Sequence, residues 1–222
     1  MNKIKYIAAV LIAIAGLGLQ QAKADLFSFN LSVPNTAISG YPGPYASVTV
    51  NRTSSTTATI TFTSLTNSGN IYLFGDGSSV AVNVNGLFTL GAITYSQAGQ
   101  TGFNPPSFTN DGSHNVDGFG VLNQTIDNFD GFDHAVNSIT FSLTKTSGNW
   151  ANAAAVLIAN GNGVFAAAHI FVTASPANLA NGALATGYAA NGGSFVPDGG
   201  TTVMLLGAAL CALGIARRFL MS

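Results

Sequence analysis

The chain between residues 25 and 173 repeats short runs in which apolar and polar side chains alternate. The run 26–33 has this period of two, and the runs 47–51, 57–65 and 136–143 repeat it. Successive side chains of a β-strand point to opposite faces of a sheet, so this period is typical of half-buried strands. The pattern therefore predicts a protein built mainly from β-sheet.

Turn-forming residues separate these runs at short intervals. Gly, Asn, Asp and Pro fill the segments 39–44, 67–70 and 75–77, where they favour chain reversals. The segment 96–115 contains Pro105-Pro106 and is the longest irregular stretch, and such loops are usually functional or disordered. Further strands are predicted at 71–74, 80–84, 87–95, 119–126 and 164–173.

One short helix is predicted within this region, over 152–159, because that run is Ala-rich and is followed by Gly161 and Gly163. Many short strands with frequent turns predict an all-β fold, an antiparallel β-sandwich that is jelly-roll-like or Ig-like. Small residues dominate 175–195, which predicts a linker. The sandwich domain is therefore expected over 25–174.

The N-terminal residues have the pattern of an export signal. Lys3 and Lys5 precede an apolar run over 6–19, and Ala22-Lys23-Ala24 follows as a site with two small residues. This order predicts a signal peptide over 1–24, with a signal helix that signal peptidase removes. Asp25 is then the first residue of the mature chain.

The C-terminal residues form a turn, an apolar run and a basic pair, in that order. The turn is Val196-Pro197-Asp198-Gly199-Gly200, the apolar run covers 201–216, and Arg217 and Arg218 follow. As a helix the run would rise about 24 Å, somewhat less than the hydrocarbon core of a bilayer. Local thinning and snorkelling of the two arginines compensate for the difference. We therefore predict a transmembrane helix within 196–222, with the arginines as a membrane stop on the cytoplasmic side.

This tail resembles the C-terminal sorting signal of exosortase substrates, the PEP-CTERM class of bacterial surface proteins. Val196-Pro197-Asp198-Gly199-Gly200 is similar to the Val-Pro-Asp-Ser-Gly variant of that signal, with Gly199 in place of Ser. The resemblance implies recognition by an exosortase-type membrane protease or transpeptidase. It also implies export across the inner membrane, a membrane-anchored precursor, and display at the cell surface or in the extracellular matrix. An ordinary single-span anchor behind a Pro/Gly spacer is the alternative.

Charge and cysteine content narrow the function further. Between residues 25 and 195 there are seven Asp and no Glu, against Arg52 and Lys145, a formal charge of −5. Binding of nucleic acid needs clustered Lys and Arg, so that class of function is excluded. The only cysteine, Cys211, lies in the predicted membrane run. The exported domain therefore has no disulfide and depends on packing.

An Asp-rich segment near residue 130 is the candidate for metal binding. Asp127, Asp130 and Asp133 lie within seven residues, and Ca²⁺ is held by several such oxygens. The alternative is an Asp-rich turn, because Asp and Asn also bond their own backbone. The three histidines, His114, His134 and His169, lack the spacing of a zinc site. We expect no metal or other cofactor, with Ca²⁺ as the one candidate.

The expected function is structural or adhesive, without catalysis. The chain has no Gly-x-Ser-x-Gly elbow to aim a serine, and nothing in the sequence places two carboxylates as a glycosidase requires. One alternative is a carbohydrate-binding module for exopolysaccharide, and a more distant one is a glycan-acting enzyme. The aromatic candidates for sugar binding are Tyr41, Tyr45, Phe103, Phe108 and Trp150, whose alternative role is to anchor loops.

Overall fold

The computed structural model describes residues 25–192, which are built mostly from antiparallel strands. Several predictions lie outside these residues. They are the signal peptide over 1–24 with Ala22 and Ala24, the motif Val196 to Gly200, the helix behind it, and Arg217 and Arg218. Within residues 25–192, no helix is long and apolar enough to cross a membrane.

Ten strands form one continuous hydrogen-bonded path, which has two halves of five strands. The first half, from the outer edge inward, is β7 (Phe88–Ser96), β10 (Ser138–Lys145), β3 (Thr57–Ser64), β2 (Ala46–Arg52) and β1 (Asp25–Pro34). The second half continues with β12 (Ala185–Asn191), β11 (Ala166–Ala174), β6 (Asp76–Val82), β9 (Gly120–Asn128) and β8 (Thr109–Val116). Two short strands lie off this path, β4 (Thr66–Asn67) and β5 (Asn70–Phe74), and β5 pairs with β11.

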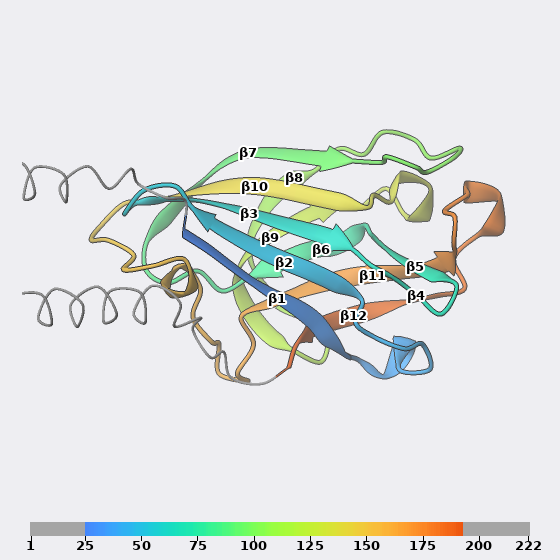
Figure 1. Ribbon diagram of the computed structural model, residues 1–222, viewed down its shortest axis with the longest axis horizontal. Helices are drawn as coiled ribbons and strands as arrows, with labels where there is room; N and C mark the ends of the chain where they lie inside the picture. Colours follow the sequence, from blue (N-terminus) through green and yellow to red (C-terminus); the bar gives the residue numbers. More distant parts are fainter. Residues whose placement is uncertain (1–24, 193–222) are drawn as a thin grey trace, which may run out of the picture.

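The first and last described strands meet in the middle of this path. β1 pairs with β2 over Asp25–Leu31 and with β12 over Leu31–Pro34. Figure 1 shows β1 in dark blue beside β12 in orange-red. The all-β prediction is confirmed, but the strands form one sheet, nearly closed on itself, where a two-sheet sandwich was expected. The pairing of β1 with β12 joins what would otherwise be two sheets.

The curled sheet encloses one large apolar core. Phe62 on β3 stacks on Phe141 of β10, with ring centroids 6.3 Å apart. It also meets Phe74 of β5 edge-on at 6.2 Å, so side chains from both halves of the sheet are in contact. The inward positions of β2, β3 and β10 are almost fully buried, as the alternation predicted.

Strand β11 is buried on both faces. Ala166, Ala168 and Ile170 point into the large core. On the other face, Ala167 and Phe171 belong to two smaller apolar clusters. Burial on both faces explains why 164–173 is a nearly continuous apolar run without alternation.

The predicted linker over 175–195 is wrong, because Ala185–Asn191 forms the central strand β12. The small residues of this segment fit a crowded position. A Cβ atom added at Gly187 would lie 2.6 Å from the side-chain oxygen of Asn35 and 2.9 Å from Ala37. The composition that suggested flexibility therefore reflects close packing.

The helix predicted over 152–159 is also wrong, and only the 3₁₀ turn η3 (Ala154–Val156) is present. The backbone at the end of this turn pairs with another segment: Asn85 donates its N–H to the carbonyl of Val156, and Ile158 donates its N–H to the carbonyl of Asn83. These extended contacts replace helical hydrogen bonds. The other 3₁₀ turns are η1 (Thr36–Ile38), η2 (Phe132–His134) and η4 (Leu179–Asn181).

We expect Phe62→Ala to lower the free energy of unfolding by about 3–5 kcal/mol, because it removes a large buried ring and leaves a cavity. Phe129 is the matched control, since 71% of its surface is exposed and Phe129→Ala should change stability little. Urea unfolding of the purified variants measures both values. Equal losses for the two substitutions would contradict the placement of the core.

Candidate functional site

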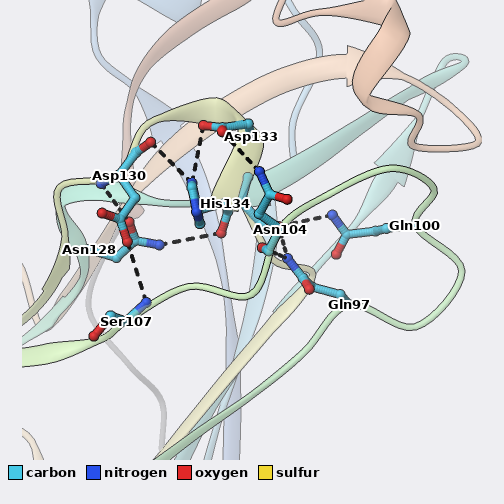
Figure 2. A network of polar contacts seen from close by, with 9 residues as sticks. Gln97, Gln100, Asn104, Ser107, Asn128, Asp130, Asp133 and His134 are labelled. Carbon is cyan, nitrogen blue, oxygen red and sulfur yellow. Dashed lines mark hydrogen bonds and ion pairs between the residues drawn. The ribbon is translucent and has the colours of Figure 1, made fainter.

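The Asp-rich segment packs against the long loop that follows β7, at one end of the sheet. The two loops are 97–108 and 129–137, and Figure 2 shows their polar side chains directed at each other. The irregular segment is shorter than predicted, because Thr109–Val116 forms the edge strand β8.

Asp133 is held by the facing loop and by its neighbour in sequence. The amide nitrogen of the Asn104 side chain donates to Asp133 Oδ2 at 3.2 Å, and the Asn104 backbone N–H donates to the Asp133 carbonyl at 2.8 Å. His134 Nδ1 lies 3.2 Å from Asp133 Oδ1. The hydrogen bond from His134, followed by that from Asn104, lowers the pKa of Asp133. The carboxylate is therefore used to fasten the two loops.

Asp130 and Asn128 shape the turn itself. The backbone N–H of Asp130 donates to Asn128 Oδ1 at 2.8 Å, and the Asn128 side-chain nitrogen donates to the carbonyl of His134 at 3.3 Å. Asp130 Oδ2 accepts the backbone N–H of Ser107 at 3.4 Å. These are the side-chain to backbone bonds of an Asp-rich turn, the alternative that the sequence left open.

Two glutamines and a row of rings complete the attachment of the loops. Gln97 and Gln100 both donate to the Ala135 carbonyl at 3.1 Å. Phe103 meets Phe132 edge-on at 5.2 Å, and Phe132 meets Phe171 of β11 at 5.5 Å. The loop cluster is thus fixed to the sheet by its own side chains.

Asp127 lies apart from this cluster, on β9, with 1% of its surface exposed. Its carboxyl group accepts the backbone N–H of Ser78 and hydrogen-bonds with Asp111 on β8. Burial, followed by the contact with Asp111, raises the pKa of Asp127 to about 7. Two carboxyl groups in contact are stable when they share a proton, so this is an acid pair. On the more exposed side of this acid pair, His114 Nε2 lies 2.8 Å from Asp111 Oδ2.

The three calcium candidates therefore have different surroundings. Asp127 belongs to the acid pair, while Asp130 and Asp133 fasten the loops. In the part of the chain that the structure describes, no group of three or more His, Cys, Asp or Glu side chains is arranged to hold a metal ion.

The histidines are also dispersed. His169 is 8% exposed on β11, where its Nε2 lies 2.7 Å from Thr186 Oγ1 and its ring stacks on Tyr188 with centroids 4.5 Å apart. Burial lowers the pKa of His169, so the neutral ring is favoured there. His114 and His134 each contact a different aspartate.

Most aromatic candidates for sugar binding anchor loops. Trp150 and Tyr45 are 1% exposed, and the Trp150 Nε1 donates to the Asn85 carbonyl at 2.9 Å. Tyr41 and Phe108 are half-buried against the large core. Among residues 25–192 the most exposed aromatic ring is instead that of Phe129, and neither its spacing nor its neighbours in the sequence distinguish it.

A groove of about 660 Å³ lies where the end of β1 meets the turn between β8 and β9. The side-chain amide of Asn35 donates to Asp117 Oδ2 at 3.2 Å across 82 residues of sequence. Val33 and Phe119 contribute apolar surface, and the lining residues are Val33, Pro34, Asn35, Thr36, Ala37, Asp117, Gly118 and Phe119. Only the fold brings these two turns together, so no local sequence signal indicates the groove.

Comparison with known proteins identifies the tail of the chain. Residues 196–219 match the VPDSG-CTERM motif, a PEP-CTERM-like C-terminal signal for exosortase sorting. No curated protein and no solved structure matches the chain. The predicted resemblance of the tail is confirmed, and it points to a secreted, surface-associated protein that an exosortase processes.

We predict that stability falls as the pH rises from about 4 to about 7, owing to Asp127. Because its folded pKa is about 7 and its unfolded value is 3.8, the folded state alone keeps the proton in this interval. The stabilisation is complete below the unfolded pKa and is lost as the pH passes the folded pKa. Asp127→Asn should flatten this dependence, because an amide side chain does not titrate in this interval. The variant should still fold, because the amide oxygen can accept the backbone N–H of Ser78.

The measurement is urea unfolding at about pH 5 and about pH 8, with the exposed Asp130→Asn as the control. Asp130→Asn should keep the wild-type dependence on pH. If the free energy of unfolding of Asp127→Asn changed with pH as much as that of the wild type, Asp127 would not be the group responsible.

Proposed function

We propose that this chain is an exported surface protein whose β domain has a structural or adhesive role and no catalytic activity. The observation that supports the proposal most strongly is the VPDSG-CTERM motif at residues 196–219. A sorting signal of this type delivers a folded domain to the exterior, where the processing enzyme removes or exchanges the hydrophobic tail. Signal peptidase at Ala24 and the exosortase are the two processing partners.

The chemistry of the described residues supports a role without catalysis. The polar side chains of the loop cluster are engaged with backbone or with each other, as in Asn104 with Asp133 and Gln97 with Ala135. The acid pair has a carboxyl of raised pKa, but Asp127 is 1% exposed. A general acid must lie within hydrogen-bonding reach of a substrate, and a buried group does not meet that condition.

The distribution of charge favours neutral partners. Six of the seven aspartates lie on β6, β8 and β9 or in the loops beside them, and Asp25 at the start of β1 lies 3.8 Å from Arg52. The amine of Lys145 donates to the Asn85 carbonyl at 2.9 Å and lies over the Trp150 ring. Arg52 and Lys145, the one Arg and the one Lys among the described residues, thus both contact groups of the protein itself. A polyanionic matrix polymer would therefore meet mostly negative charge on this domain.

Binding of a neutral glycan in the groove is the second candidate function. Asn35 and Asp117 offer amide and carboxylate groups for sugar hydroxyls, beside apolar surface from Val33 and Phe119. We expect Asp117→Ala to reduce retention of the protein on columns of neutral polysaccharide by several-fold, since it removes a charge-assisted hydrogen bond. Asp130→Ala, on the loop cluster, serves as the control. If both variants were retained as strongly as the wild type, the groove would be excluded as the glycan-binding site.

For the main proposal, we expect Pro197→Ala or Asp198→Ala to block removal of the segment 201–216 while export continues. The apolar segment presents the motif at the membrane face, and the motif supplies recognition. Leu206→Ile keeps the apolar run and should be processed normally. An internal epitope tag followed through cell fractionation, with an antibody to the last residues, separates precursor from product. If wild type and both motif variants keep the C-terminus in the membrane fraction, the tail is only an anchor.

A further inference from the structure

The outward side of the first half of the sheet is formed by short polar side chains. Strands β7, β10, β3, β2 and β1 lie next to one another in this half (Figure 1). On β3, Ile60 and Phe62 belong to the large core. The alternate residues Thr59, Thr61 and Thr63 therefore point away from the core. The other four strands alternate in the same way.

Strand pairing aligns these outward side chains in rows that run across the five strands. From β1 to β7, the first row is Ser28, Thr49, Thr61, Thr140 and Thr94. The second row is Asn30, Ser47, Thr63, Ser138 and Ser96. Neighbouring strands lie about 4.8 Å apart, so each row is about 19 Å long, and the two rows are about 7 Å apart. We call these two rows the hydroxyl face.

The hydroxyl groups of the first row contact each other and keep hydrogen-bonding capacity for a ligand. Ser28 Oγ lies 3.0 Å from Thr49 Oγ1, and Thr61 Oγ1 lies 3.0 Å from Thr140 Oγ1. Each hydroxyl has one donor site and two acceptor sites, so a pair uses one proton and leaves the second for another acceptor. Ser28 and Thr94, at the two ends of the row, are exposed.

The composition of the hydroxyl face favours a polar and uncharged ligand. Neither row contains a charged residue, and six of the seven aspartates of residues 25–192 lie on or beside β6, β8 and β9 in the other half. A neutral ligand on these rows would therefore not have to desolvate a charge. The centres of interfaces between proteins are largely apolar, whereas these rows contain no large apolar side chain. A second protein chain is therefore the less suitable partner.

We propose that the hydroxyl face binds an extended, uncharged polysaccharide whose chain lies along a row. Such a chain presents hydroxyl groups at regular intervals on a nearly straight line, as the row does. Its C–H groups lie against the methyl groups of threonines, and its hydroxyl groups exchange hydrogen bonds with theirs. The proposal rests on the surface location proposed above, because an exported domain is the one that meets polysaccharides of the matrix.

Binding of this kind depends on the length and shape of the glycan. A single hydrogen bond on an exposed surface contributes little, because water competes for both partners. Several hydrogen bonds along one chain add up, since the first contact raises the effective concentration of the next sugar residue at the next strand. Free glucose should therefore not compete for the face, and amylose, whose chain coils, should compete poorly.

Retention on cellulose particles tests the proposal, because cellulose is an extended and uncharged glycan. The assay uses the full-length chain, purified in a detergent without a sugar head group. All proteins carry Asp117→Ala, which weakens binding in the groove, so that the remaining retention reports the hydroxyl face. We expect this background protein to be retained, and free glucose not to release it.

In this background, Thr61→Val combined with Thr140→Val removes a hydroxyl pair from the centre of a row. Valine keeps the branched shape and the preference for strands, so the fold should be preserved. We expect the dissociation constant for cellulose to rise about tenfold, because two hydroxyl partners are lost. Ser28→Ala combined with Thr49→Val removes the neighbouring pair and should have a similar effect, which gives a second test if the first variant folds poorly.

Thr66→Val combined with Thr101→Val is the matched control, since it makes the same change at two exposed positions outside the hydroxyl face. This control should bind cellulose like the background protein. Equal dissociation constants for the control and the two row variants would overturn the proposal. A background protein that is not retained would also overturn it, because the groove alone would then account for any retention of the wild type.

Sedimentation of the same proteins distinguishes a glycan from a second copy of the chain. We expect the background protein and the row variants to sediment alike. A dimer that Thr61→Val and Thr140→Val convert to a monomer would show that the face contacts another copy, and would contradict the proposal. Because no step requires removal of the tail, these results are independent of exosortase processing.

Discussion

The structure depends on the pairing of β1 with β12, the first and last described strands. Four strands lie on each side of this pair along the sheet, and the pairing of Leu31–Pro34 with Ala189–Asn191 links the two halves. Because both strands are central, both ends of the described chain must be in place before the core is closed. Such distant pairing is slow to form, since the entropy of a long loop opposes it.

The described domain must be held together without covalent cross-links. The domain has no cysteine, so packing of rings such as Phe62, Phe74 and Phe141 must hold the two halves together. Aspartates of the candidate site contribute to the fold: Asp130 and Asp133 fasten two loops, and the buried Asp127 contacts Asp111. The sorting motif at 196–219 then supplies the part of the function that the chain shares with known proteins.

Sequence periodicity predicted those strands that have one buried and one exposed face, such as β1 and β3. It failed where composition reflects packing: Gly187 and Ala189 are small because neighbours are close, yet small residues also mark linkers. The helix expected near residue 155 failed because Val156 and Ile158 pair with Asn85 and Asn83, a contact across some seventy residues. Clustering of aspartates was visible in the sequence, but the burial of Asp127 and the groove at Asn35 and Asp117 arise only from tertiary contacts.

Native-state hydrogen exchange tests the central role of the β1–β12 pair most directly. If this pair joins the halves of one cooperative unit, its amides should exchange only through global unfolding, as slowly as those between β2 and β3. Peptide-level protection measured by mass spectrometry resolves these strands. Fast exchange in Leu31–Pro34 and Ala189–Asn191, with β2 and β3 still protected, would show that the two halves separate independently and would contradict the account.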